Sequence, residues 1–436
     1  MLNTIIQLLK DASILVSLFT LVGCIIQRKS INDTIVSVTK TFLGFILLFA
    51  AARVMISPSL HSFSNIFMMA FDVKGIVPNN EVVIVDAMDQ LGPQFASAIA
   101  LGLIGAMVLN LVFARITPLK FVVLSGHHVF FMVSCLTIIS LLHGYSITTS
   151  AIMGSVITAV WCVVSPALLV RYCRRIKNVE PLRVSGDFSI GQFGSTSYML
   201  SGFIGDKFGN ADNDIEEAKL PTALGFLTDK STSTFLVMFL FFLVSALVAG
   251  FDKVQIIADH VAKHGHVNVL LFLLKQSGLF AAGVFVLGRG VNMFVEELIP
   301  AFKGISDKLI KNSVPAIEIY SLFPYSKNAV FVGFICCTIA GFITMVIIPY
   351  FGLPVIVPSL LFTFASGGGS GIIGNATGGV RGCILGSILC GVLSTIGSAL
   401  IFQPIWDAGV HAATTYSTTD FTILGELLHH TLSLFS

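Results

Sequence analysis

Two long stretches of the chain contain no Asp, Glu, Lys or Arg, and neither is a simple series of apolar helices. They cover residues 121–170 and 328–380. About 20 apolar residues of helix cross a bilayer core of about 30 Å, so each stretch is long enough for two membrane spans. Ser-Gly-His-His at 125–128 interrupts the first, and three prolines and a glycine-rich run at 366–370 interrupt the second. Irregular backbone at membrane depth occurs where it is buried in protein or lines a cavity, so this pattern predicts a polytopic transporter.

Further apolar segments bring the predicted number of spans to about ten or eleven. The first apolar segment of the chain ends at Arg28-Lys29 without a small-residue cleavage site. We therefore expect it to be a retained membrane span rather than a cleaved signal peptide. The other candidates lie at about residues 34–56, 90–114, 120–142, 147–170, 231–251, 266–288, 328–348 and 382–406, with shorter apolar pieces near 194–205, 352–365 and 421–435. The predicted fold class is an all-α polytopic membrane protein.

Charged residues between the spans predict orientation and organisation. Cytoplasmic loops carry an excess of Lys and Arg. Arg28-Lys29 and the basic cluster within 171–183 should therefore be cytoplasmic, which places the N-terminus outside. The polar segment 206–230 joins two halves of comparable length, 1–205 and 231–436. Equal halves suggest an internal repeat, although the sequence shows no match between them beyond what chance would give.

The composition excludes a soluble enzyme. Of the 436 residues, 55% are hydrophobic and 11% are charged, whereas soluble domains carry about 25% charged residues. The net charge of +2 is small and the basic residues lie in short loops, so no nucleic-acid partner is expected. The eight cysteines form no C-x-x-C pair, so we predict neither a metal site nor a disulfide framework, and no cofactor.

His127 and His128 are ionisable residues in an apolar region, directly after Ser125-Gly126. Adjacent helical residues point about 100° apart, so at most one of the two is expected to face a given cavity. Either ring could simply bond a neighbouring carbonyl group. Ionisable side chains inside a membrane are costly and usually face the protein interior or a water-filled path, which favours a functional interpretation.

Residues 186–197 are too rich in glycine and hydroxyl side chains to form a continuous lipid-facing helix. They could form a surface loop. They could also form a re-entrant hairpin whose tip, at Gly191-Gln192, presents backbone N–H groups and an amide to a polyhydroxylated ligand. We favour the hairpin because apolar residues 198–204 follow immediately.

Residues 289–327 are the part of the second half richest in charge. Residues 291–309 have an amphipathic period, which predicts an interfacial helix with a solvated charged face. Glu318 differs because apolar residues flank it, so its carboxylate must be paired or line a polar cavity. Two interpretations remain: a substrate contact that could act as a general base, or a structural ion pair.

Several segments, taken in order, resemble enzyme IIC, the membrane subunit of the ascorbate branch of the bacterial phosphotransferase system. The resemblance covers nearly the whole chain and depends on the joint order and spacing of its parts. Its most specific parts are Arg28–Ile31, Lys40–Leu48, Leu124–His127, Asp187–Gly191 and Val291–Leu298, continuing through Ala301–Ser306 to Ala316–Glu318.

The resemblance implies a homodimeric sugar permease of the bacterial cytoplasmic (inner) membrane. It implies about eleven spans with re-entrant hairpins and an inverted repeat, arranged as a core domain for the substrate and a second domain for the dimer interface. The substrate would be phosphorylated by a phosphocysteine on a separate enzyme IIB, itself charged through enzyme IIA. The implied substrate-binding positions are Gly126, His127, Phe131, Gly191, Gln192, Phe193 and Glu318.

Four of these positions differ from the ascorbate members. Phe131 and Phe193 stand where those members carry glutamine, Gln192 stands where they carry histidine, and Glu318 stands where they carry aspartate. A lost amide removes a hydrogen bond to a buried polar ligand, worth about 1–3 kcal/mol if nothing replaces it. Residues 194–199 are partly similar to a run found in galactitol-type members, so a polyol or pentose-like substrate is the alternative to ascorbate.

A stand-alone secondary transporter of the same fold is the alternative from a different class. It would be coupled to protons through Glu318 and His127, or not coupled at all. The two classes differ in whether a protein with a phosphocysteine loop is required for uptake.

Overall fold

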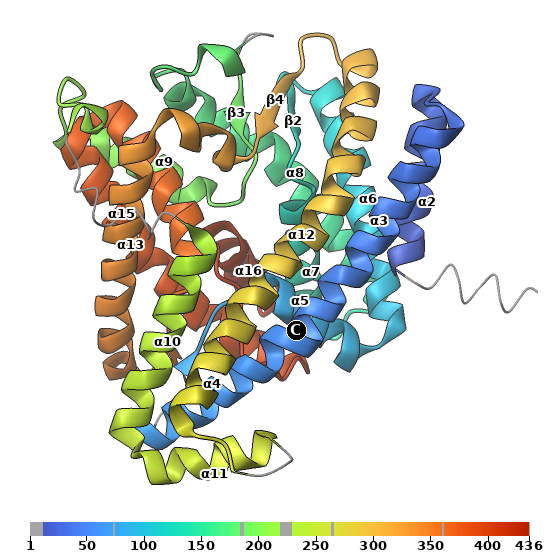
Figure 1. Cartoon of the computed structure of the whole chain (residues 1–436). Helices are drawn as coiled ribbons and strands as arrows, with labels where there is room; N and C mark the ends of the chain where they lie inside the picture. Colours follow the sequence, from blue (N-terminus) through green and yellow to red (C-terminus); the bar gives the residue numbers. More distant parts are fainter. Residues whose placement is uncertain are drawn as a thin grey trace, which may run out of the picture.

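The computed structural model describes residues 12–72, 75–183, 187–218, 229–262, 266–359 and 362–435, and most of them are helical (Figure 1). The helices of the first half are α2 (Ala12–Gln27), α3 (Ile31–Ala50), α4 (Ser57–Phe71), α5 (Asn80–Leu91), α6 (Pro93–Ile116), α7 (Gly126–Leu142), α8 (Ile147–Cys173) and α9 (Ser195–Phe208). Those of the second half are α10 (Lys230–Ala249), α11 (Phe251–Ala262), α12 (Val269–Leu309), α13 (Lys327–Ile347), α15 (Gly368–Asp407) and α16 (Thr419–Leu432).

Within the described ranges, short segments of other types join these helices. Two are π-helical, η1 (Ala51–Ile56) and η7 (Thr363–Gly367). Four are 3₁₀ turns, η2 (Glu180–Leu182), η3 (Ile215–Glu217), η5 (Ile319–Tyr325) and η6 (Ile348–Phe351). The strands are β1 (Gly75–Ile76), β2 (Phe121–Val123), β3 (Ser189–Ile190), β4 (Val314–Ile317) and β5 (Val355–Ile356).

Within the described ranges, five helical segments are long and apolar enough to cross a membrane. They are Pro93–Ile116, Ile147–Cys173, Val269–Gly290, Lys327–Phe351 and Thr363–Asp407, and Gly126–Leu142 and Thr234–Ala249 are shorter apolar helices. The predicted all-α polytopic membrane fold is confirmed. The count of ten or eleven spans, the inverted repeat and the division into core and dimer domains stay predictions.

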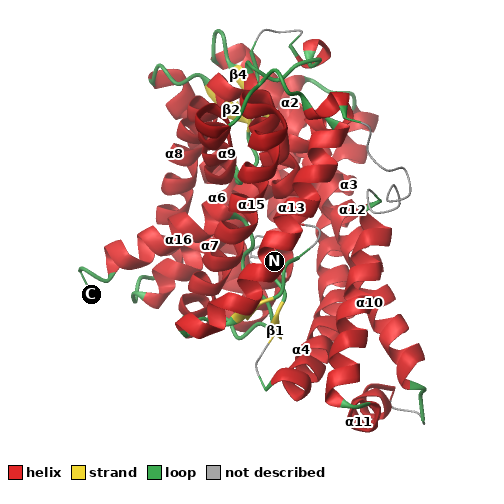
Figure 2. Cartoon of the chain, turned by 90° about the vertical axis from the view of Figure 1, so that its left-hand side faces the viewer, coloured by secondary structure: helices red, strands yellow, loops and turns green. Residues whose placement is uncertain are grey.

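The strands form two small parallel sheets from segments that lie far apart in the sequence. One has the order β2-β4-β3, with Val123 and Ser189 both in register with Ala316 of the central strand. The other pairs β1 with β5. Figure 2 shows β2 and β4 near one end of the helical body and β1 towards the other.

The three-stranded sheet positions the candidate site. Its strands are parallel, so their carboxyl ends meet at one edge of the sheet. The residues that follow those ends are Gly126-His127 after β2, Gly191-Gln192 after β3 and Glu318 after β4. All three predicted site segments are therefore brought together by strand pairing.

Helix α9 packs tightly against α15 through small residues, so an element of the first half lies in the core of the second. A Cβ atom on Gly386 would stand 1.8 Å from Oγ of Ser201, and one on Gly205 would stand 2.0 Å from Oγ1 of Thr377. Close backbone approach through Gly and Ser is typical of helix packing in membranes. The two sequence halves are thus interleaved in space.

One predicted element is wrong. Residues 291–309 do not form a separate interfacial helix, because α12 runs without a break from Val269 to Leu309 over 41 residues. The amphipathic period of 291–309 belongs to the C-terminal part of a helix whose first part is apolar enough to span a membrane. A helix that leaves an apolar environment changes its pattern without ending, and sequence periodicity alone does not distinguish that case from a new helix.

Candidate functional site

A cavity of about 440 Å³ lies beside the edge of the three-stranded sheet. Its wall combines the first turns of α5 and α7, the middle of α12, the residues that precede α16 and the segments after β3, β4 and β5. Among the predicted site residues, the wall includes His127, Phe131, Gln192 and Glu318. Apolar side chains of Val284 and Leu287 from α12, together with Phe362, complete it.

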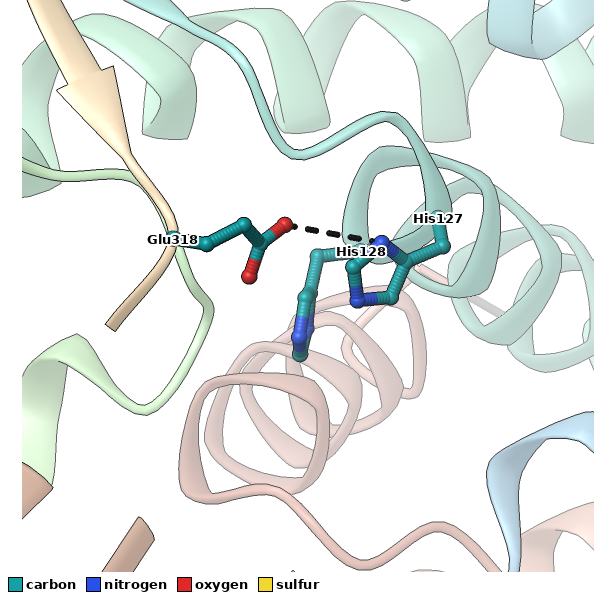
Figure 3. A group of neighbouring side chains, drawn as sticks. All are labelled: His127, His128 and Glu318. Carbon is teal, nitrogen blue, oxygen red and sulfur yellow. Dashed lines mark ion pairs between the residues drawn. The ribbon is translucent and has the colours of Figure 1, made fainter. Parts of the chain in front are cut away.

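His127 and Glu318 face each other in this cavity. Nδ1 of His127 lies 3.5 Å from Oε1 of Glu318, and their side chains are 18% and 22% exposed (Figure 3). Neither oxygen of Glu318 has a hydrogen-bond partner among the described residues, and the same holds for Nδ1 of His127. Two positions that the family resemblance implies for substrate binding therefore lie together on one cavity wall, and their polar atoms make no hydrogen bond within the described residues.

His128 is held by aromatic packing beneath the first turn of α7. Its ring stacks on Phe421 of α16 at a centroid distance of 5.8 Å and an interplanar angle of 28°. It also lies 6.0 Å from the ring of Phe193. The side chain is 6% exposed, and its Nδ1 atom has no partner in the described ranges. These contacts fix the first turn of α7, which also carries His127.

Gln192 presents its amide to the cavity from the turn between β3 and α9. The backbone N–H of Gly191 donates to the carbonyl of Ile317 at 2.8 Å, which ties the turn to β4. A side chain at Gly191 would collide with the carbonyl of Ala316, since a Cβ atom there would stand 2.6 Å away. Gln192 is 3% exposed, and its Oε1 atom has no described partner.

The remaining predicted positions lie near the cavity but not on its wall. Gly126 is buried as the first residue of α7, and Gly191 serves the close approach of two strands. Phe193 is fully buried and packs against His128 and Phe421, at 6.0 and 6.1 Å between ring centroids. It supports the wall from behind, whereas Phe131 forms part of it.

Residues 79–81 are functional candidates that the sequence analysis missed. Asn79 caps α5 by accepting a hydrogen bond from the N–H of Val82 at 3.0 Å, and Glu81 follows in the first turn. Oδ1 of Asn80 accepts from the N–H of Ser417 at 2.9 Å, so the start of α5 is joined to the segment before α16. Both segments line the cavity. The signal was present, because Asn-Asn-Glu before an apolar run is typical of a helix start.

The donor set could also hold a metal ion. His127, His128 and Glu318 each offer one ligand atom, and these atoms all lie within 4.8 Å of one another. Zinc ligands bind at about 2.0–2.2 Å, so donors that share an ion lie at most about 4.4 Å apart, and the 3.5 Å between Nδ1 of His127 and Oε1 of Glu318 is within that limit. The first turns of α5 and α7, however, direct the positive ends of their dipoles at the cavity, which disfavours an added cation. Hydrogen bonding to a neutral or anionic ligand fits better.

Comparison with known proteins places the chain in a family. Residues 7–420 match the family described as EIIC-GAT, PTS system sugar-specific permease component. The chain is also 24% identical over 439 residues to the "Ascorbate-specific PTS system EIIC component" of Mycoplasma pneumoniae, an alignment that covers 89% of this chain. The chain spans 64% of the length of that relative. Because the family match covers nearly the whole chain, this protein belongs to the sugar-specific permease (enzyme IIC) component family of the phosphotransferase system.

Proposed function

We propose that the chain carries a small polyhydroxylated compound inward through the cavity that holds His127 and Glu318. Enzyme IIB, a separate protein charged through enzyme IIA, would phosphorylate the compound. The family supports a sugar permease, and the relative's name supports L-ascorbate or a compound related to it. We further propose a homodimer in the bacterial cytoplasmic membrane, with the N-terminus outside.

The observation that carries this proposal is the pair of unsatisfied oxygens on Glu318. An ionised carboxylate only accepts hydrogen bonds, so it needs donors. Two neighbouring hydroxyl groups of a sugar or polyol supply such donors. Oε1 of Gln192, also without a described partner, adds an acceptor on the same wall. A buried acceptor that stays unpaired costs about 1–3 kcal/mol, so a ligand that supplies the donors is favoured.

The apolar part of the wall bears on the choice of substrate. Phe131 offers an aromatic surface where the ascorbate members carry an amide, so an oxygen-rich edge of a ligand would find no direct partner there. The C–H face of a galactitol-like or pentitol-like compound can pack on this ring, and ascorbate can reach the same position through bridging waters. Galactitol and L-ascorbate are therefore the first compounds to test.

Glu318 also suits the role of general base. When a substrate hydroxyl attacks the phosphorus of a phosphocysteine on enzyme IIB, the new P–O bond forms, the P–S bond breaks and the hydroxyl proton must be accepted. A carboxylate within hydrogen-bond reach of that hydroxyl can take the proton. The thiolate of enzyme IIB leaves, and no cysteine of this chain takes part.

The test uses the full chain reconstituted in proteoliposomes, with labelled galactitol and L-ascorbate outside. We expect accumulation of the phosphorylated compound only when phosphorylated enzyme IIB is present on the cytoplasmic side. Uptake that needs no enzyme IIB and follows a pH gradient would replace this proposal with a proton-coupled transporter that uses the His127–Glu318 pair. Absence of uptake for a broad panel of sugars and polyols under both conditions would overturn the transport proposal.

A further inference from the structure

Asp420 is a fully buried carboxylate that joins three helices near the cavity. It is the second residue of α16 and is 0% exposed. Its Oδ2 atom accepts from Nε1 of Trp161 on α8 at 2.8 Å and from the backbone N–H of Ser195 at 3.1 Å. Its Oδ1 atom accepts from the backbone N–H of Thr196 at 2.8 Å.

These three donors compensate the charge of Asp420 without a cation. A buried carboxylate is costly unless hydrogen bonds or a counter-charge satisfy it. Two of the donors are the first N–H groups of α9, where the helix dipole favours a negative charge. The residue before α9 is Gly194, which has no side chain to cap the helix. Asp420 therefore caps α9 from another helix, 225 residues away in sequence.

The segments that Asp420 joins both line the cavity. On the α9 side, the carbonyl of Gln192 accepts from the N–H of Gly194 at 2.9 Å and from Oγ of Ser195 at 3.2 Å. On the α16 side, Ser417 and Thr418 precede the helix and form part of the wall, as does Gln192. A second bond, from Oγ of Ser197 to Oγ1 of Thr419 at 3.2 Å, holds the same two helix starts together.

We propose that Asp420 is a positioning residue for substrate recognition. By capping α9 from the start of α16, it fixes the turn that presents the Gln192 amide and keeps that amide opposite the 417–418 segment. Asp420 does not itself line the cavity, so it acts through Gln192 rather than by touching the ligand. The ligand-binding part of this inference rests on the proposed function, while the positioning part concerns the fold of the cavity wall.

The first experiment measures positioning without any ligand. Hydrogen exchange of the purified full chain in detergent is compared between the native protein and Asp420→Asn, which keeps the shape but places an amide donor against backbone N–H groups. We expect exchange at residues 192–197 and 417–421 to accelerate about tenfold, with α6 unchanged. The matched control is Asp407→Asn, which changes an exposed carboxylate whose one hydrogen bond within the described ranges is with Gln403, and it should leave both segments as they are.

The second experiment separates positioning of Gln192 from general packing. Binding of galactitol and of L-ascorbate is measured by calorimetry for Gln192→Ala, Asp420→Asn and the double variant. If Asp420 acts through Gln192, the double variant binds no more weakly than the weaker single variant. If instead the losses of affinity in the two single variants multiply in the double variant, Asp420 supports the protein independently of Gln192. That result would overturn the inference.

The outcomes keep the two proposals apart. If neither compound binds the native protein, the proposed substrate class is wrong, and the exchange data alone decide the role of Asp420. Unchanged exchange at 192–197, or equal acceleration throughout the chain, would overturn it. Should Asp420→Asn fail to fold, Trp161→Phe takes its place, because it removes one donor from Oδ2 and should cause a smaller acceleration in the same two segments.

Discussion

Glu318 and Asp420 are two carboxylates in apolar surroundings with opposite environments. Asp420 is fully buried and accepts three hydrogen bonds from α8 and α9. Glu318 is partly exposed to a cavity, and neither of its oxygens has a hydrogen-bond partner in the described part of the chain. Asp420 thus finds its hydrogen-bond donors within the protein, whereas Glu318 has only the 3.5 Å contact to His127 among the described residues and can accept hydrogen bonds from a ligand.

Asp420 also helps to form the cavity wall that surrounds Glu318. Asp420 fixes the starts of α9 and α16, and the sheet fixes the ends of β2, β3 and β4. Glu318 and His127 therefore lie on a cavity wall that is already formed before a ligand binds. A preformed wall reduces the ordering cost of binding. Mutations at the two carboxylates should therefore affect different quantities.

The largest effect on binding is expected for Glu318→Gln. The amide keeps the shape but replaces one acceptor with a donor and removes the charge, so hydroxyl groups of the ligand lose charge-assisted bonds. We expect binding of the transported compound, measured by calorimetry, to weaken about 10- to 100-fold. The matched control is Glu297→Gln on α12, whose carboxylate pairs with Lys40 at 3.0 Å and does not line the cavity. Equal loss in both variants would contradict the role of Glu318.

The largest effect on stability is expected for Asp420→Ala. Truncation leaves the N–H groups of Ser195, Thr196 and Trp161 without their acceptor in a buried site. We expect the free energy of unfolding to fall by at least about 2 kcal/mol, seen as a drop of several degrees in the unfolding temperature in detergent. Glu318→Ala should lower that temperature less, since it removes one 3.5 Å contact to His127 at the cavity and no hydrogen bond within the described residues. If Glu318→Ala lowered the unfolding temperature more than Asp420→Ala, the proposed contrast between the two carboxylates would be wrong.

A smaller effect is expected for Gln192→Ala. Only one amide contact to the ligand is removed, so binding should weaken about 3- to 10-fold while the unfolding temperature stays the same. Gln403→Ala serves as the control, because among the described residues its amide bonds the nearby exposed Asp407 alone, at 2.7 Å. No change in affinity for Gln192→Ala would remove this residue from the site.

The features that could be predicted from the sequence are those that a membrane environment requires of any protein within it. A bilayer requires long apolar helices, so the fold class could be predicted from hydrophobic runs alone. It also makes ionisable groups expensive, which is why His127 and Glu318 could each be recognised as a candidate before their positions were known. Neither prediction needed knowledge of which segments pack together.

The missed residues depend on contacts that sequence does not display. Asp420 has its partners 225 and 259 positions away, and nothing near it in sequence announces a cap for another helix. Phe193 seemed equivalent to Phe131 because both replace amides of the ascorbate members, yet only Phe131 is on the cavity wall. The conformation of the turn after a parallel strand decides whether a side chain there points towards the cavity or away from it. In this protein the turn after β3 is fixed by hydrogen bonds to the distant Asp420 and to β4.

The smallest expected effect tests this distinction between two phenylalanines. Phe131→Gln introduces an amide on the cavity wall. The centre of the native Phe131 ring lies 5.7 Å from the centre of the His127 ring. We expect the affinity for L-ascorbate to rise up to about tenfold relative to galactitol, since the new amide restores the hydrogen-bonding group that the ascorbate members carry at this position. Phe193→Gln should give no such gain, because that side chain is fully buried behind His128 and Phe421, and its amide would lower the unfolding temperature instead. Equal gains in affinity for the two variants would show that Phe193 reaches the ligand when it binds, and that the wall rearranges rather than standing preformed.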